Sequence, residues 1–487
     1  MLFNSIDFLI FFPIVTILYF AIPKKYRYIW LLIASYYFYM NWNAKYALLL
    51  LLSTGITYLT SLMIAKGNKR KFWLIVCAVA NLGILGLFKY FDFALENINR
   101  VLSLVHVQAV EPAFDIVLPV GISFYTFQAL SYTIDVYRGE IEPERNFAKY
   151  ALFVSFFPQL VAGPIERSGH LLKQIQKGTT FDYNNAKNGL LLMMWGLFEK
   201  IVVADRAAVI VNEIYENYEN YWGSLIVVAT ILFAIQIYCD FAGYSHIAVG
   251  AAKVMGYDLM NNFEQPYFAT SIKDFWRRWH ISLSTWFKDY LYIPLGGNRC
   301  SKWKNYRNLL ITFTVSGLWH GASWHYVIWG GLHGIYQVVG NMTMAVRDRI
   351  KGVLRIKTDC FSYRLFQRLI TGFLVTAAWF FFRIKDLGDG LGMLKKLFTD
   401  FNFPVLLYGK LYRLGLDEKQ FFWLLLSILV LFIVDALHEK GISIRKKLEK
   451  QNLVFRWICY FSAVFFLFIS AIQDYGSSAA NFIYFQF

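Results

Sequence analysis

Long apolar runs separated by short polar or basic segments form the dominant pattern of this 487-residue chain. A helix needs about 20 residues to cross the hydrocarbon core of a bilayer, so each long run is a candidate membrane span. Two runs, 28–43 and 147–163, are short enough to be tilted, half-inserted or re-entrant helices. We expect about ten to twelve spans. The candidates are residues 6–23, 28–43, 46–65, 72–90, 116–137, 147–163, 188–206, 224–252, 307–340, 364–384, 421–437 and 455–474.

Basic residues cluster between these runs and predict the orientation of the chain. Cytoplasmic loops of membrane proteins carry an excess of Lys and Arg. Such clusters follow the first and third runs and precede the last run, which places both termini outside. The clusters are Lys24, Lys25 and Arg27; Lys66, Lys69, Arg70 and Lys71; and Arg445, Lys446, Lys447 and Lys450.

Composition supports the membrane interpretation. The chain is 57% hydrophobic and 16% charged, with a mean hydropathy of +0.43, whereas a soluble protein is about half apolar and about a quarter charged. The net charge is +16. Because the basic residues lie in short loops, membrane orientation explains this charge better than nucleic-acid binding does, and no nucleic-acid partner is expected.

Several kinds of chemistry lack their usual sequence signals. The five cysteines are scattered without metal-ligand spacing, so we expect neither a metal site nor a disulfide framework. The chain also lacks a phosphate-binding P-loop, a GxSxG elbow and an HExxH motif. ATP coupling within the chain is therefore not expected. We find no internal repeat, linker or sizeable polar domain, and we interpret residues 1–487 as one integral membrane domain.

Four of the eight histidines lie between Asp274 and Gly334. Within residues 271–291, aromatic residues recur at three- and four-residue steps, and basic residues fill the other side. This pattern predicts one amphipathic helix lying flat at the cytoplasmic interface. That geometry is compatible with function, because His280 lies on the apolar face and would point toward a substrate path.

The run 307–340 contains His320 and His333 among glycines and tryptophans. Thirteen residues separate the two histidines, so on one straight helix they would point about 140° apart. One of them then faces a catalytic cavity while the other serves packing. Buried histidines can also be structural hydrogen-bonding residues, and both interpretations stay open. The glycines predict close helix packing.

Asp240 lies in the segment YCDFAGYSH at the end of a strongly apolar run. A carboxylate at membrane depth is retained only when it is paired, and such residues are functional candidates. A structural or pocket-shaping role is favoured over catalysis.

Six segments carry a resemblance that covers nearly the whole chain. The sequence resembles the membrane-bound O-acyltransferase superfamily, within its bacterial branch of alginate and peptidoglycan O-acetyltransferases and the related teichoic-acid D-alanyl transfer proteins. The segments are MLFNSIDFLIFFP, LPVGISFYTFQALSYTIDVYRG, FPQLVAGPIER, QIYCDFAGYSHIAVG, DFWRRWHISLSTWFKDYLYIPLGGNR and GLWHGASWHYVIWGGLHG.

The resemblance implies an all-α polytopic membrane protein, with about ten to twelve transmembrane helices and with interfacial and re-entrant helices around a central tunnel. The catalytic core would span approximately 116–340. The family's essential histidine falls on His320, and its second polar position falls on His280. The remaining expected substrate-binding residues are Trp276, Trp279, Arg277, Arg278, Asp240, Trp319 and His333.

The implied chemistry is O-acyl transfer without a bound cofactor. An acyl thioester, acetyl-CoA or a charged carrier protein, would arrive from the cytoplasm, and a hydroxyl acceptor would approach from the other side. His320 would serve as general base and His280 would stabilise the oxyanion. Arg277, Arg278 and Lys288 would attract the anionic donor, although headgroup contact explains them equally well.

The leading hypothesis is acetyl transfer toward an extracytoplasmic polysaccharide at the bacterial cytoplasmic membrane, with an extracytoplasmic acetyltransferase as partner. The alternative within the superfamily is D-alanyl transfer from a carrier protein toward teichoic acid. The alternative of another class is a transporter or flippase that uses Asp240 and the histidines as a proton relay. Transporters often show two similar halves, which this sequence does not show.

Overall fold

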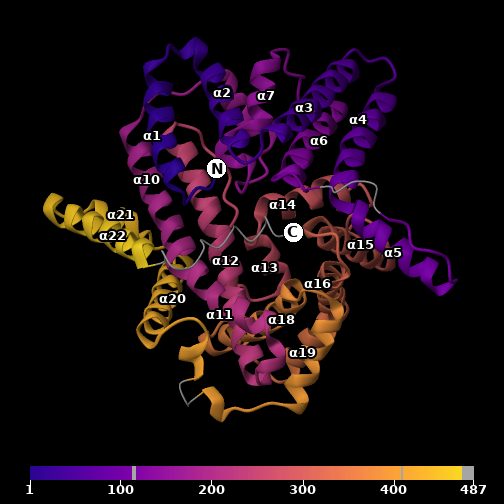
Figure 1. The fold of residues 1–487 in the computed structure, drawn as a ribbon, viewed down its shortest axis with the longest axis vertical. Coiled ribbons are helices and arrows are strands. Elements are labelled where there is room, and N and C mark those ends of the chain that lie inside the picture. The colour runs from indigo at the N-terminus through magenta and orange to yellow at the C-terminus, as the bar shows by residue number, and fades with distance from the viewer. Residues whose placement is uncertain (112–116, 407–409, 474–487) are drawn as a thin grey trace. The chain divides into compact units, whose positions relative to one another are not determined.

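The computed structural model describes residues 1–111, 117–406 and 410–473 (Figure 1). Residue 116, at the start of one predicted span, and residue 474, at the end of another, lie outside the described residues. The described ranges contain helices and no β-strand. The all-helical prediction is therefore confirmed.

Six helical segments in the described part of the chain are long and apolar enough to cross a membrane. Each overlaps a predicted run, although Arg70–Leu104 extends well beyond the predicted 72–90. This overlap confirms a polytopic membrane protein. Other predicted runs form shorter helices, such as Ile6–Ala21. The six segments are Ala44–Ala65, Arg70–Leu104, Gly223–Val254, Phe361–Arg383, Glu418–Glu439 and Leu453–Ala471.

The chain forms two compact units that interleave along the sequence. The first unit comprises Met1–Met193 and Ser245–Asn261. Its helices are α1 (Ile6–Ala21), α2 (Arg27–Met40), α3 (Ala44–Ala65), α4 (Arg70–Leu85), α5 (Phe91–Leu104), α6 (Ile122–Arg138), α7 (Phe147–Ser155), α8 (Phe157–Leu160), α9 (Ser168–Lys177), most of α10 (Tyr183–Leu197) and the end of α12 (Gly223–Val254).

Polar side chains join the helices of the first unit. Ser53 on α3 donates a hydrogen bond to Asn81 Oδ1 on α4 at 2.6 Å, and Tyr150 on α7 donates to Thr57 Oγ1 on α3 at 2.7 Å. Lipid offers no hydrogen-bonding partner, so such pairs between apolar helices hold them in register.

The second unit comprises Met194–Tyr244 and Asn262–Phe487. It begins with the last turn of α10, which a π-helical turn, Phe198–Ala204, follows. Its helices are α11 (Asp205–Glu216), most of α12, α13 (Ile272–Arg278), α14 (Ile281–Phe287), α15 (Lys302–His320), α16 (Trp324–Met342), α17 (Met344–Val353), α18 (Phe361–Arg383), α19 (Leu387–Thr399), α20 (Glu418–Glu439), α21 (Ile444–Glu449) and α22 (Leu453–Gln473).

Two helices predicted as continuous are broken in the structure. Residues 271–291 form α13 and α14 followed by a π-helical turn, Lys288–Tyr292. The run 307–340 forms α15 and α16, which pack against each other. Both predictions of a single helix were wrong. His280 lies at the first break, and His320 is the last residue before the second.

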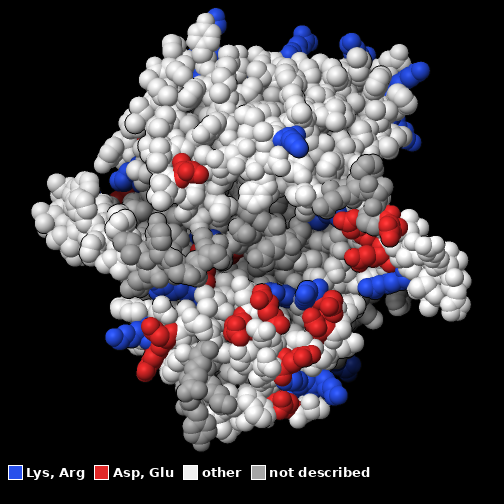
Figure 2. Space-filling model, in the orientation of Figure 1, with Lys and Arg blue, Asp and Glu red and all other residues white. Residues whose placement is uncertain are grey.

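Apolar side chains cover much of the described surface. Most of the face in Figure 2 carries neither Lys or Arg nor Asp or Glu. On α22, Phe461 and Phe465 are each about two-thirds exposed. A soluble protein does not expose apolar surface on this scale, whereas a membrane protein presents it to lipid.

Candidate active site

The break between α13 and α14 turns His280 into the interior. Ser271 caps α13, its Oγ accepting a hydrogen bond from the Asp274 backbone N–H. At His280 the backbone enters the left-handed region, with φ 43° and ψ 55°. A non-glycine residue there carries a strain of about 1–2 kcal/mol, so the surrounding structure must stabilise this conformation.

A neighbouring loop supplies that stabilisation. The Ile281 N–H donates to the Asn262 carbonyl at 3.0 Å, and the Ser282 N–H donates to Asn262 Oδ1 at 3.2 Å. The Glu264 N–H donates to the Arg278 carbonyl at 3.0 Å. The backbone on both sides of His280 is therefore held by residues 262–264, and the His280 side chain is fully buried.

Close approach of α15 and α16 brings the other histidines together. A Cβ on Gly317 would meet the Tyr326 carbonyl oxygen, and a Cβ on Gly330 would meet the Phe313 carbonyl oxygen. The predicted glycine packing is confirmed at these two positions. After the chain turns at Gly321, α16 runs back along α15 (Figure 1).

Imidazole and indole rings alternate through the interior of the second unit. The ring centroids are 6.1 Å apart for His280–Trp319, 5.0 Å for Trp319–His320 and 5.0 Å for His320–Trp329. They are 5.1 Å apart for Trp329–His333 and 5.0 Å for His333–Trp276. We call these six residues the histidine row. All are buried, none more than 9% exposed.

The row places His320 and His333 on the same indole, that of Trp329. The expectation that the two would face different surroundings assumed one straight helix and was wrong. Because the chain reverses between α15 and α16, residues on two helices converge on one cluster.

One end of the row has a defined tautomer. The Trp276 Nε1–H donates to His333 Nδ1 at 3.1 Å. A neutral imidazole that accepts at Nδ1 carries its proton on Nε2. His333 therefore presents an N–H donor at Nε2, and this buried atom has no hydrogen-bond partner among the described residues.

Trp279 lies beside the row in a dense aromatic cluster. It stacks on Phe275 at 5.4 Å and meets Phe263 edge-on at 5.0 Å. Trp379 of α18 lies 5.0 Å from Trp279 and stacks on Trp329 at 5.4 Å. Trp279 thus joins the α13 break to α18 through packing.

Asp240 is paired, as the cost of burying a carboxylate requires. Lys200 Nζ lies 2.7 Å from Asp240 Oδ1 and 2.7 Å from Asp205 Oδ1. The Lys200 side chain is 1% exposed, and its ammonium lies 5.5 Å from the centre of the Tyr244 ring. We call Lys200, Asp205 and Asp240 the lysine triad.

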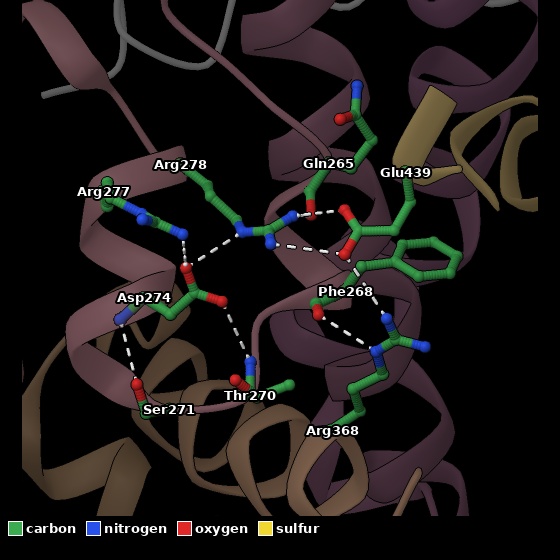
Figure 3. Close-up of polar contacts among 9 residues, drawn as sticks. All are labelled: Gln265, Phe268, Thr270, Ser271, Asp274, Arg277, Arg278, Arg368 and Glu439. Atoms are coloured by element: carbon green, nitrogen blue, oxygen red, sulfur yellow. Dashed lines mark hydrogen bonds and ion pairs between the residues drawn. The ribbon is translucent and has the colours of Figure 1, made fainter. Parts of the chain in front are cut away.

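The two predicted arginines differ in their surroundings (Figure 3). The Arg277 side chain is 75% exposed and donates to Asp274 Oδ1 at 2.6 Å. The Arg278 side chain is 15% exposed and donates through Nη1 and Nη2 to the two carboxylate oxygens of Glu439, at 2.6 and 3.3 Å. Burial alone would raise the pKa of Asp274, but the Thr270 N–H and both arginines bring it below its ordinary value.

Sequence reasoning missed three residues of this region: Trp329, Lys200 and Glu439. Lys200 had a signal, since LFEKIVVADR places charges inside an apolar run. Trp329 belonged to a run already noted for its tryptophans. Glu439 gave no comparable signal, because it ends an apolar helix 161 residues beyond Arg278.

Buried imidazoles beside aromatic rings can accept and donate protons where little water competes. The membrane-spanning helices and the histidine row are together typical of a polytopic membrane protein with imidazole groups in its interior. Residues 140–382, which include the whole row, match MBOAT, the membrane-bound O-acyltransferase family.

Curated relatives extend the match over most of the chain. The probable alginate O-acetylase AlgI of Pseudomonas aeruginosa is 37% identical over 88% of this chain and 81% of its own length. The peptidoglycan O-acetyltransferase of Helicobacter pylori is 36% identical over 75% of this chain and 73% of its own length. The teichoic acid D-alanyltransferase of Bacillus subtilis is 28% identical over 57% of this chain and 71% of its own length.

The chain belongs to the membrane-bound O-acyltransferase family and is an O-acyltransferase.

Proposed function

We propose that this enzyme transfers an acetyl group from a cytoplasmic thioester across the bacterial cytoplasmic membrane, for O-acetylation of an extracytoplasmic polysaccharide. The single observation that carries the proposal is the position of His320. It ends α15 within the histidine row, 3% exposed, in a chain similar to alginate and peptidoglycan O-acetyltransferases.

In the proposed reaction, the acceptor hydroxyl oxygen attacks the thioester carbonyl carbon. The C–O bond forms, the C–S bond breaks, and the hydroxyl proton passes to His320 and then to the leaving thiolate. His280 donates a hydrogen bond to the carbonyl oxygen as negative charge develops there. His333, with its Nε2–H, orients the substrate from the other end of the row.

Other residues bind the substrates in this proposal. Trp276, Trp279 and Trp319 form the walls of the substrate path. Arg277 and Lys288 attract the anionic groups of the donor at the cytoplasmic mouth. Asp240, neutralised by Lys200, shapes the interior and takes no part in proton transfer.

The donor is acetyl-CoA or an acetylated carrier, and no bound cofactor is required. The acceptor is reached directly or through an extracytoplasmic acetyltransferase that receives the acetyl group and modifies the polysaccharide. That partner places the final transfer outside the membrane.

The test is thioester consumption by the purified protein in lipid, with acetyl-CoA as donor. We expect His320→Ala to lower the rate by about 10²–10⁴-fold, the usual contribution of a general base. His325 is the matched control, a 5% exposed histidine of the same segment whose Nδ1 lies 3.1 Å from the Phe381 carbonyl. His325→Asn should lower the melting temperature and keep the rate per folded molecule.

Full activity in a folded His320→Ala enzyme would remove His320 from the mechanism. Equal losses in both histidine variants would show that the fold, and not a base, had been disturbed.

D-alanyl transfer is the second candidate, favoured by the similarity to the Bacillus subtilis teichoic acid D-alanyltransferase. Turnover only with a D-alanyl-charged carrier protein would support it over acetyl transfer. A well-folded enzyme that consumes neither thioester would point to a transporter or flippase.

A further inference from the structure

The last turn of α20 holds the segment that carries His280, although α20 lies beyond the family-matched residues 140–382. We infer that Glu439 and Arg278 are positioning residues, whose ion pair fixes the α13–α14 break and with it the orientation of His280. The inference rests on the proposed function insofar as it concerns turnover.

The contact between Glu439 and Arg278 has the geometry of a strong ion pair. Both carboxylate oxygens of Glu439 accept from the guanidinium, at 2.6 and 3.3 Å (Figure 3). The side chains are 23% and 15% exposed. A bidentate pair with limited water access fixes direction as well as distance, unlike a single exposed contact.

Arg278 is also fixed through its backbone and its Nε. Its carbonyl accepts from the Glu264 N–H at 3.0 Å, and its Nε donates to Asp274 Oδ1 at 3.2 Å. Only Trp279 separates Arg278 from His280. A shift of the Arg278 side chain would therefore reach the strained backbone at His280 within two residues.

A second contact comes from the same face of α20. Asp435 lies one helical turn before Glu439, and its Oδ2 accepts from the Tyr238 hydroxyl at 3.0 Å. The Tyr238 ring packs 6.2 Å from Trp279 and 5.9 Å from Phe263. Helix α20 thus contacts Arg278 through Glu439. Through Asp435 it also contacts the Tyr238 ring, which packs against Trp279 and Phe263.

A third contact ties α18 into the same cluster. Arg368 Nη2 lies 3.4 Å from Glu439 Oε1, and its Nε donates to the Phe268 carbonyl at 3.1 Å. The guanidinium lies 5.2 Å from the centre of the Phe268 ring. Glu439 therefore bridges two arginines, and removing its charge leaves both without this partner.

These contacts distinguish Arg278 from its neighbour. A guanidinium that donates to both Glu439 oxygens and to Asp274 has little capacity left for a donor phosphate. Arg277 is exposed and suited to that task. Donor attraction thus falls to Arg277, and positioning falls to Arg278.

The experiment is a double-mutant cycle of Arg278→Gln, Glu439→Gln and their combination, measured as acyl-transfer kinetics of the purified enzyme in lipid. We expect each single variant to lower kcat by about 10- to 100-fold, the effect of a displaced catalytic group. The donor KM should change by less than about twofold, and the combination should cost little more than either single change. Arg278→Lys should recover part of kcat.

Asp348→Asn is the matched control. Asp348 forms a surface ion pair with Lys351 at 2.9 Å on α17, and its loss should leave kcat and KM as in the wild type.

Hydrogen–deuterium exchange over residues 271–287 gives a readout that needs no turnover. Faster exchange in both single variants, and not in Asp348→Asn, would support the inference even if the wild type consumed no thioester, in which case the proposed function alone would fail. Wild-type exchange, or additive losses of kcat, would overturn the inference while leaving acyl transfer standing. A raised donor KM in Arg278→Gln but not in Glu439→Gln would overturn it in favour of donor binding.

Discussion

The histidine row and the lysine triad bury polar groups in the same unit by opposite means. In the triad, Lys200 lies at 2.7 Å from each of two carboxylates, so every charge has an opposite charge beside it. In the row, imidazoles lie edge-on to indole rings at about 5 Å. An ammonium must be paired when buried, whereas a neutral imidazole can be buried by packing.

This difference distinguishes the structural role of the lysine triad from the chemical role proposed for the histidine row. An ion pair favours the charged form of both partners and stabilises a helix contact. An imidazole packed among rings keeps nitrogen atoms that can exchange a proton with a bound substrate. This contrast supports the proposal that proton transfer belongs to the row and not to Asp240. Four predictions test this contrast.

The largest expected effect is the loss of the triad's cation. Lys200→Met leaves Asp240 buried without this partner and should destabilise the protein by about 3–5 kcal/mol. Thermal unfolding in detergent measures this. Adding Asp240→Asn should restore part of the stability, since the more deeply buried of the two carboxylates that lost this cation is then neutral. A single variant as stable as the wild type would mean that water reaches Asp240.

The second-largest effect is expected at the close contact between α15 and α16. Gly330→Ala would push a methyl group into the Phe313 carbonyl oxygen and should cost about 1–3 kcal/mol as overpacking. Gly331 is the matched control, because nothing lies within 4 Å of a Cβ there. Gly331→Ala should be neutral or stabilise by up to about 1 kcal/mol. Equal melting temperatures for the two variants would contradict the α15–α16 packing.

A smaller effect is expected from the hydrogen bond with Trp276 that fixes the tautomer of His333. Trp276→Phe keeps an aromatic ring and loses the Nε1–H that donates to His333. One hydrogen bond is worth about 0.5–1.5 kcal/mol, so kcat for acyl transfer should fall roughly 2- to 10-fold. Trp303→Phe, at a 76% exposed tryptophan of α15, is the control. Unchanged kcat would show that the tautomer of His333 does not matter.

The smallest effect concerns a third histidine environment, in the first unit. His170 Nδ1 lies 2.9 Å from Glu166 Oε2, and its Nε2 lies 3.6 Å from Asp258 Oδ2. The hydrogen bond with Glu166 raises the pKa of His170, against the opposing effect of burial.

Because the folded pKa is raised, this stabilisation is complete below the unfolded value of about 6.5 and is lost as pH rises through the folded pKa. His170 is 43% exposed, so solvent screens its pair with Glu166. We therefore expect His170→Gln to lower the melting temperature at low pH by on the order of 1 °C. The melting-temperature gap between wild type and His170→Gln should narrow as the pH rises above the unfolded value of about 6.5. A constant gap would mean that His170 has the same pKa in the folded and the unfolded protein.

Hydrophobic pattern alone predicted the helical spans well. The runs 46–65, 224–252 and 421–437 correspond to helices Ala44–Ala65, Gly223–Val254 and Glu418–Glu439. Lipid requires about 20 apolar residues and intrasegment hydrogen bonds, which leaves a strong periodic signal in sequence.

Pattern failed where helices break without proline. At His280 the residues 262–264 form hydrogen bonds that stabilise a left-handed conformation. Neither the helical periodicity nor the side-chain types of 271–291 encode that loop's position.

The sequence by itself determined the spanning helices and the histidines in the aromatic segment, because composition and hydrophobic period are local properties of the chain. Its resemblance to a known family, carried by six motifs in order, gave the O-acyltransferase class. Only the tertiary structure decided that three histidines join one row, that Asp240 pairs with Lys200, and that Arg278 meets Glu439. The Lys200–Asp240, Trp276–His333 and Arg278–Glu439 contacts join residues 40, 57 and 161 positions apart. They depend on which helix faces meet, and burial and charge pairing select those faces only when the whole unit packs.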